Sequence, residues 1–245
     1  MAIVTCRARS RERSAGGLSP RATDFRRRLL RWYARHRRDL PWRRSRDPYA
    51  ILVSEIMLQQ TQVVRVRDFY GRFLARYPTL EDLAAARPAQ VRDAWAGLGY
   101  YARARNLQAA ARHVVRCHAG ALPREVEALA RLPGIGRYTA AAVASIAFGA
   151  DVGTVDTNVA RVLARVFRLP GRRGTGPRAR ALWRTAQRLV PPGRAGDWNQ
   201  ALMDLGATVC VARRPRCEPC PVRRACLTGL RRGAQNGARP ARRAS

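Results

Sequence analysis

The sequence predicts an all-α fold. Apolar residues recur at intervals of three and four along most of the chain, as at Phe25, Leu29 and Trp32, and this is the period of one face of a helix. Gly and Pro separate these runs, and no stretch alternates apolar and polar residues for long enough to require a sheet. An apolar content of 47% in 245 residues is sufficient to bury the core of one large domain.

The expected helices follow one another along most of this domain. Thr79 and Asp82 have the spacing of a capping box, which predicts a helix start. Gly97 and Gly99 then interrupt the pattern before a basic helix, and the Gly/Arg run 170–176 predicts a loop. The expected helices cover 25–33, 51–56, 69–74, Tyr100–His118, Val126–Leu132, Tyr138–Phe148, Asn158–Phe167, Ala181–Val190 and Asn199–Thr208.

The charge of the chain indicates a polyanionic partner. Its formal net charge is +32, from 48 basic and 16 acidic residues, and every basic residue is arginine. Duplex DNA is the commonest polyanion that such an excess fits, and a coding bias toward arginine with a solvated basic surface is the alternative. Residues 1–20 and 231–245 lack an apolar period, so we expect a disordered basic arm and tail.

No segment has the apolar length of a membrane span or the form of a signal peptide. We therefore expect a soluble monomer in the bacterial cytoplasm or nucleoid.

A glycine-containing turn joins two of the expected helices. In Leu132–Arg137, Gly134 and Gly136 can adopt positive φ and allow a phosphate to approach the backbone, beside the charge of Arg137. Such glycines also occur where two helices simply fold back on each other. Twenty residues after Gly136, Asp156 is placed as the N-cap of the next helix, which is in itself an ordinary structural role.

Four cysteines are clustered near the end of the chain. Cys210, Cys217, Cys220 and Cys226 have the spacing C-x6-C-x2-C-x5-C, which brings four thiolates to one metal centre without long-range folding. A zinc site, a set of disulfides and a ferredoxin-like redox protein are the alternatives. Zinc ribbons more often have two Cys-x-x-Cys pairs, and only one occurs in this cluster.

Glu55 is a candidate general acid. It lies among apolar helix positions in the run Leu52–Val63, where loss of solvent raises the pKa of a carboxyl group. The pattern alone is equally consistent with a glutamate that bonds a neighbouring helix or faces solvent.

Several of these motifs resemble known families of DNA glycosylases. Leu132–Asp156 resembles the helix-hairpin-helix motif and its trailing aspartate, and the cysteine spacing resembles the 4Fe-4S loop of the endonuclease III and MutY branch. The resemblance covers roughly residues 24–228. Four further runs resemble MutY-type adenine DNA glycosylases, namely Pro41–Arg43, Leu58–Val63, Gly97–Leu107 and Asn199–Gly206.

The resemblance implies a helix-hairpin-helix glycosylase fold of two helical subdomains within residues 21–230. A six-helix part covers about 45–155, and a cluster part is formed by 21–44 and 156–230. By the same resemblance the four cysteines hold a structural 4Fe-4S cluster, and the basic loop Val211–Arg216 meets DNA phosphates.

Catalytic roles also follow from the resemblance. Glu55 would protonate N7 of adenine, Asp156 would stabilise the sugar cation, and Tyr138 and Asn158 would assist them. Residues that line the adenine pocket would be Trp42, Arg43 and Gln200. Residues that wedge into the base stack around the partner base would be Leu58, Gln60 and Tyr100.

Two departures qualify this expectation. Bifunctional relatives place a Schiff-base lysine at the position of Tyr138, and this chain has no lysine, so we expect a monofunctional enzyme. MutY-type enzymes usually continue into a Nudix-like domain that recognises 8-oxoguanine, whereas this chain ends 19 residues after Cys226.

We expect removal of adenine paired with 8-oxoguanine or guanine. Removal of thymine or uracil opposite guanine by a short mismatch glycosylase, and an iron-sulfur DNA-binding protein without catalysis, remain the alternatives.

Overall fold

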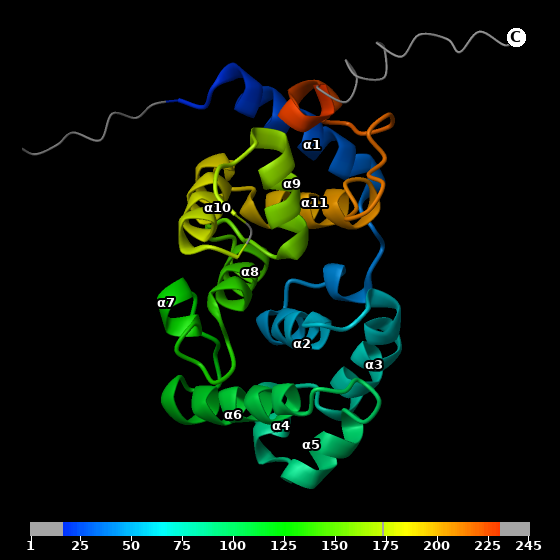
Figure 1. Cartoon of the computed structure of the whole chain (residues 1–245). Coiled ribbons are helices and arrows are strands. Elements are labelled where there is room, and N and C mark those ends of the chain that lie inside the picture. The colour runs from blue at the N-terminus through cyan, green and yellow to red at the C-terminus, as the bar shows by residue number, and fades with distance from the viewer. Residues whose placement is uncertain (1–16, 173, 231–245) are drawn as a thin grey trace, which may run out of the picture.

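The computed structural model describes residues 17–172 and 174–230 (Figure 1), so most of the expected basic arm and all of the expected basic tail lie outside the described residues. The described part is helical and contains no strand, which confirms the all-α prediction. Its α-helices are α1 Pro20–His36, α2 Pro48–Leu58, α3 Val63–Arg76, α4 Leu80–Ala85, α5 Pro88–Ala94, α6 Ala102–Cys117, α7 Val126–Leu129, α8 Arg137–Ala147, α9 Thr157–Phe167, α10 Gly176–Leu189 and α11 Ala195–Thr208, and two 3-10 turns are η1 Pro41–Arg43 and η2 Arg223–Ala225.

Local sequence signals account for most helix starts. Thr79 and Asp82 form the predicted capping box at the start of α4. Ser19 accepts a hydrogen bond from the backbone N–H of Ala22, so α1 begins at Pro20. Ser19 and Pro20 therefore do not belong to an unstructured arm.

Most predicted helices differ from the observed ones at one or both ends, and α3 begins at Val63, six residues before the expected range 69–74. α10 begins at Gly176, five residues before the expected start, because a proline at its first turn needs no backbone donor and fixes a helical φ. α7 ends at Leu129 instead of Leu132, since the chain turns there toward the hairpin.

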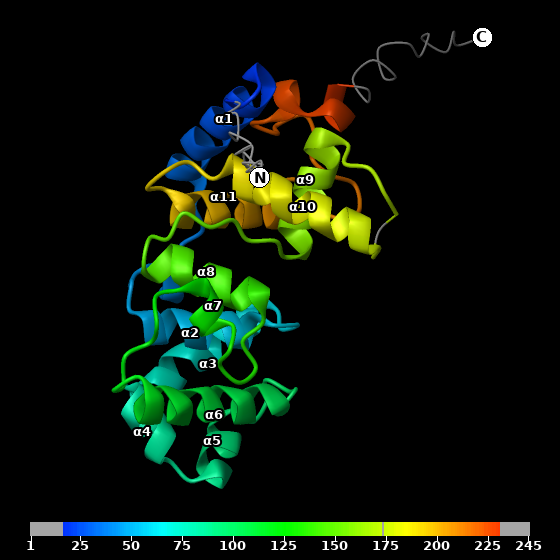
Figure 2. The ribbon, with the colours of Figure 1, turned by 90° about the vertical axis from the view of Figure 1, so that its left-hand side faces the viewer.

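The helices form two halves, each with its own apolar core (Figure 2). The first core is formed by η1 and α2 to α8, and the second by α1, α9 to α11 and η2. Leu40 and Trp42 pack in the first core although they precede residue 45. α8 packs against both α2 and α11, so it joins the two halves.

The helix α2 is the most buried element of the first half. Every residue from Tyr49 to Met57 is buried, as expected of a helix that is apolar on all faces. Asp47 caps its N-terminus by accepting hydrogen bonds from the backbone N–H groups of Tyr49 and Ala50. None of the helices in the described ranges has the length and apolar character that a membrane span requires.

Candidate active site

A cavity of about 860 Å³ lies between the two halves, with walls from η1 and α2 on one side and from α9 and α11 on the other. It contains all the predicted catalytic residues and every predicted substrate-binding residue except Tyr100. This size is in the range of small-molecule sites. The predicted residues that line it are Trp42, Arg43, Glu55, Leu58, Gln60, Tyr138, Asp156, Asn158 and Gln200.

Glu55 is a buried carboxylic acid on α2 and is only 6% exposed. The pKa of Glu55 is raised to about 7. Burial and the negative charge of Asp156 raise this pKa, whereas a hydrogen bond from Tyr138 and the charge of Arg43 lower it. Desolvation is the largest of these causes, because a charged carboxylate is poorly stabilised away from water. A substantial fraction of Glu55 is therefore protonated near neutral pH, as a general acid requires.

Asp156 is fixed at the N-cap of α9, as predicted. One carboxylate oxygen accepts a hydrogen bond of 2.6 Å from the backbone N–H of Val159, and the other accepts one of 3.0 Å from Asn158 Nδ2. Asn158 Oδ1 in turn accepts a hydrogen bond from Arg161. The position at a helix N-terminus stabilises the negative charge of Asp156.

Tyr138 lies close to both carboxyl groups. Burial raises its pKa well above the ordinary value, and the charges of Glu55 and Asp156 raise it further. Its hydroxyl oxygen also lies 3.8 Å from Met203 Sδ, so the single hydroxyl proton can be donated either to this sulfur or to Glu55. Tyr138 is therefore a neutral phenol that can donate a hydrogen bond beside the acid.

Arg43 is held on the cavity wall by a residue that the sequence analysis did not single out. Asp204 on α11 is fully buried and accepts two hydrogen bonds from Arg43, of 2.6 and 2.9 Å, and another of 2.6 Å from Arg38. The one available signal was a carboxylate between the apolar residues Leu202 and Leu205 of α11. A bidentate pair fixes the plane of the Arg43 guanidinium.

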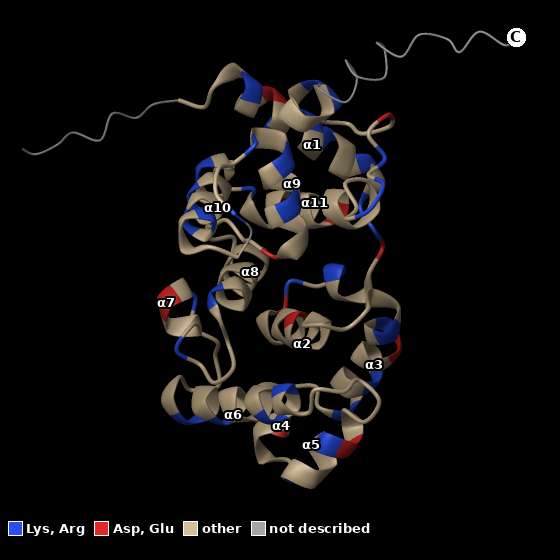
Figure 3. Ribbon diagram, in the orientation of Figure 1, with Lys and Arg blue, Asp and Glu red and all other residues tan. Residues whose placement is uncertain are grey.

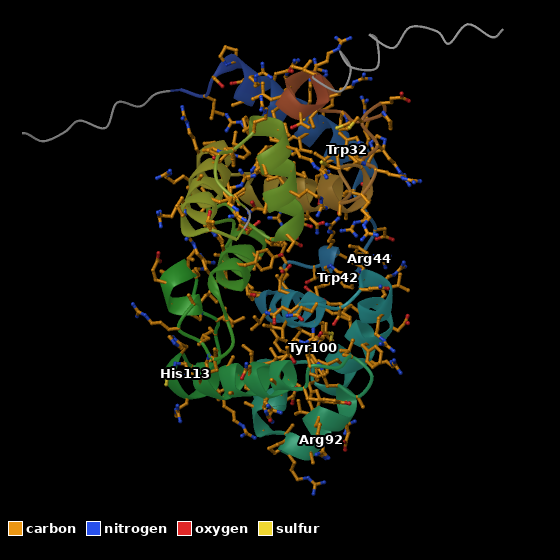
Figure 4. All side chains as sticks on the ribbon, viewed as in Figure 1. Trp32, Trp42, Arg44, Arg92, Tyr100 and His113 are labelled. Carbon is orange, nitrogen blue, oxygen red and sulfur yellow. The ribbon has the colours of Figure 1, made fainter. Side chains whose placement is uncertain are left out.

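A second groove, of about 910 Å³, lies beside the cavity and is lined by Gln60 and Tyr100. Gln60 lines both hollows, so it stands between them. Figure 4 shows Trp42 above α2 and Tyr100 below it. Tyr100 is 61% exposed, which is unusual for an aromatic ring of this size.

The hairpin before α8 has the predicted turn, but only one of its two glycines has a positive φ. Gly134 has a φ of 72°, whereas Gly136 has a φ of −84° and is the extended N-cap of α8. The expectation of positive φ at Gly136 is therefore wrong, because an N-cap residue has an extended backbone. A Cβ at Gly136 would meet no atom within 4 Å, so the side-chain direction of this residue is open.

Arg137, the first residue of α8, stacks on the ring of Trp183 at 3.9 Å. The hairpin does not line the cavity, although the next residue, Tyr138, does.

Gly134→Ala is expected to lower the free energy of unfolding by roughly 2 kcal/mol, from strain at positive φ and steric overlap. A Cβ there would overlap Asn106 Cβ. Gly136→Ala is the matched control and should leave the stability nearly unchanged. Chemical denaturation of the two variants measures this difference, and equal destabilisation would refute the role given to Gly134.

The four clustered cysteines line one small cavity in the second half, of about 30 Å³, with apolar walls that include Val162 and Val222. All four are free thiols. Burial raises the pKa of Cys220 to about 11, and the other three thiols raise it further, whereas a backbone hydrogen bond lowers it. Arg165 Nη1 lies 3.4 Å from Cys210 Sγ, and the N–H of Gly229 lies 3.3 Å from Cys226 Sγ.

This donor set fits an iron-sulfur cluster. Four thiols line one small apolar space, and N–H donors point at two of the sulfurs, which are features of the sites in which proteins hold such clusters. In the described part of the chain, no three His, Cys, Asp or Glu side chains are grouped to hold a single metal ion.

The hairpin, the buried acid and the capping aspartate all fall within one family pattern. The pattern described as "HhH-GPD superfamily base excision DNA repair protein" matches residues 53–192. The chain belongs to this superfamily.

Relatives within the superfamily include adenine DNA glycosylases. The chain is 52% identical over 213 residues to "Adenine DNA glycosylase" of Homo sapiens, which covers 83% of this chain and 39% of that protein. It is 47% identical over 195 residues to the protein of that name in Mycolicibacterium smegmatis, which covers 79% of this chain and 66% of that one. The chain therefore spans less than half the length of its human relative.

Solved structures of the superfamily share the fold. A thermostable thymine-DNA glycosylase superposes with a TM-score of 0.78 at 35% identity, over 86% of this chain and 97% of that one. A non-covalent endonuclease III–DNA complex superposes with a TM-score of 0.72 at 25% identity, over 85% and 95%. The predicted helix-hairpin-helix glycosylase fold is thus confirmed.

Proposed function

We propose that this chain is a monofunctional DNA glycosylase that removes adenine mispaired with 8-oxoguanine or guanine. The observation that carries the proposal is a buried carboxylic acid with a pKa of about 7, Glu55, in one cavity with the capping carboxylate of Asp156. The adenine DNA glycosylases among its relatives support adenine as the base.

Glu55 is the proton donor of the proposed reaction. Its proton passes to N7 of the flipped adenine, and the N-glycosidic bond then breaks with both electrons leaving on the base. Protonation makes adenine a better leaving group, which is what a general acid contributes. Tyr138 donates a hydrogen bond that keeps the Glu55 carboxyl group in place.

Asp156 stabilises the positive charge that forms on the sugar. Its two hydrogen bonds hold the carboxylate at the cavity wall, so it needs no rearrangement when the cation forms. Water then adds to the cation, its extra proton passes to the Glu55 carboxylate left by the first step, and an abasic site remains. The two carboxyl groups thus divide the work of a glycoside hydrolysis.

The adenine pocket is formed by Trp42, Arg43 and Gln200. Arg43 is already bound to Asp204, so its position is set before the base enters. Gln200 accepts a hydrogen bond of 3.3 Å from Tyr33, which orients its amide. A fixed set of polar groups favours one base over another at low entropic cost.

The reaction ends at base removal. A lyase needs an amine to form a Schiff base with the sugar, and the position of that lysine in bifunctional relatives is occupied by the phenol of Tyr138. The chain contains no lysine at all.

DNA is held by backbone amides and arginines. The backbone amides of Gly134 and Gly136 and the cation of Arg137 are expected to bind one phosphate at the start of α8. Arginines are distributed over both halves of the molecule (Figure 3), so duplex affinity is expected to fall steeply with salt. Gly136→Ala should weaken binding because its methyl group would stand where the phosphate approaches.

Cys210, Cys217, Cys220 and Cys226 would hold a 4Fe-4S cluster, which supplies structural order to the loop between them. Purified protein is expected to contain about four iron and four sulfide per chain, the composition of one such cluster. Cys217→Ser should lower the iron content and the melting temperature together. Zinc in the protein without iron would refute the cluster.

Thymine or uracil opposite guanine is the second candidate substrate. A thymine-DNA glycosylase shares the fold at 35% identity, and a tyrosine at the position of Tyr138 is compatible with that branch. A DNA-binding protein without catalysis is disfavoured, because it would have no use for a carboxylic acid buried at an energetic cost.

A single-turnover assay on duplexes with A:8-oxoguanine, A:G, T:G and U:G tests the proposal, each divided into samples with and without alkali. Adenine release that needs alkali for strand cleavage is the expected result. Release of thymine or uracil instead would assign the protein to the mismatch branch. Strand cleavage without alkali would refute the monofunctional assignment.

A further inference from the structure

Arg103, in the first turn of α6, is a buried cation without an acidic partner. It is only 8% exposed, and within the described residues it forms no ion pair with a carboxylate. A buried charge requires compensation by other polar groups. From the sequence alone, Arg103 was expected only to contribute to a basic helix.

The compensation comes from the end of α2 with the loop after it, and from the loop before α6. The guanidinium donates hydrogen bonds to carbonyls at the end of α2 and to carbonyls of the segment before α6. A cation is favourable at the C-terminus of a helix, where carbonyls lack partners. The acceptors are the carbonyl oxygens of Ile56, Met57, Gln59, Leu98 and Gly99 and the hydroxyl of Thr61.

Each of these loops contains a strained residue. Gln60 has a φ of 56° and Tyr100 a φ of 48°, which side chains other than glycine rarely adopt. Such conformations persist only where the surroundings hold them. The Arg103 guanidinium also lies 5.4 Å from the centre of the Tyr100 ring and 5.5 Å from that of Trp95.

We infer that Arg103 is a positioning residue that holds Gln60 and Tyr100 together as one preformed wedge, and so controls base extrusion instead of bond cleavage. The inference rests on the proposed function. Arg103 does not line the catalytic cavity, so it acts through the two loops. Its fork of donors spans both loops, which a single ammonium group cannot do.

Arg103→Lys tests the inference because it keeps the charge and removes the fork. Arg112→Lys is the matched control on the same helix, since Arg112 also donates to two carbonyls, Ala84 and Ala86, but is exposed. Each variant is assayed on adenine opposite guanine and on adenine opposite an abasic-site analogue, where little pairing opposes extrusion.

Arg103→Lys is expected to slow single-turnover release from A:G by about 10- to 100-fold, the cost of a few kcal/mol of extrusion. Release opposite the abasic analogue should change by less than about threefold, because extrusion is easy there. Arg112→Lys should alter neither rate. Equal losses on both substrates, or no loss on A:G, would overturn the inference.

Two readouts do not depend on base release. In a Glu55→Gln background, the fluorescence of 2-aminopurine at the target position should increase on protein binding, and this increase should be smaller when Arg103→Lys is also present. In the free protein, amide hydrogen exchange should increase in residues 56–62 and 97–101 together, and unchanged exchange would refute the holding role. If the unmodified protein releases no adenine from any duplex, the proposed function fails, and the exchange result still decides the role of Arg103.

Discussion

Glu55→Gln is expected to slow adenine release by orders of magnitude while making the protein more stable. Glutamine cannot give a proton to N7, so single-turnover release should fall by at least about 10²- to 10⁴-fold, the usual contribution of a general acid. Duplex binding should be retained, because the shape and hydrogen-bonding capacity of the side chain remain. A duplex binding assay beside the release assay separates these two effects.

The gain in stability follows from the raised pKa of Glu55. In the unfolded chain this pKa is near its ordinary value of 4.5, and in the folded protein it is about 7. Below pH 4.5 Glu55 is protonated in both the folded and the unfolded protein, so the substitution has little effect on the free energy of unfolding. As the pH rises from 4.5 to 7, the unfolded chain releases this proton before the folded protein does. The free energy of unfolding therefore falls by about 3 kcal/mol over this range, and a glutamine in place of Glu55 would avoid that loss.

The measurement is chemical denaturation at pH 4.5 and pH 8, with the exposed Glu127→Gln as control. A gain for Glu55→Gln at pH 8 that disappears at pH 4.5 is expected. The rate of base release by the unmodified protein should fall as the pH rises through about 7. A gain of equal size at both pH values would show that burial does not hold Glu55 in its neutral form.

Asp204→Asn is expected to cause the largest loss of stability of any single carboxylate change. Two guanidinium groups, of Arg38 and Arg43, would lose the charge that balances them. Removing one partner of a buried pair typically costs about 3–5 kcal/mol. Arg43 would also leave its fixed position, so adenine release should slow even where the protein remains folded.

The surface pair of Asp39 and Arg44 provides the matched control. Both side chains are more than half exposed, and their hydrogen bonds are as short as those of the buried pair. Asp39→Asn should leave both the denaturation midpoint and the rate of release unchanged, because exposed pairs contribute little. An equal effect of the two substitutions would contradict the role given to burial.

The sequence predicted this fold well because its signals are local. Helix periodicity, the capping box at Thr79 and the N-cap at Asp156 each depend on residues within one or two turns. The predicted site residues likewise occupy short motifs, and the structure brings those of the catalytic set into one cavity. Their chemical roles remain predictions.

The features that the sequence did not predict depend on distant partners. Asp204 reaches Arg43 across more than a hundred residues of chain, and the acceptors of Arg103 lie in two separate loops. A single sequence contains no record of such pairings. The backbone of Gly136 was mispredicted for a related reason, since two glycines in one turn do not show which of them has a positive φ.

Consecutive residues at the start of α8 face different surroundings. Arg137 stacks on Trp183 at the exposed hairpin, and Tyr138 lines the catalytic cavity. On the proposed function, the phosphate bound by the hairpin determines which nucleotide lies at the mouth of the cavity, because the spacing between hairpin and cavity is fixed. Such an enzyme cannot test neighbouring bases while the hairpin binds a phosphate. Its search along DNA is therefore completed in a more weakly bound complex, before the hairpin binds.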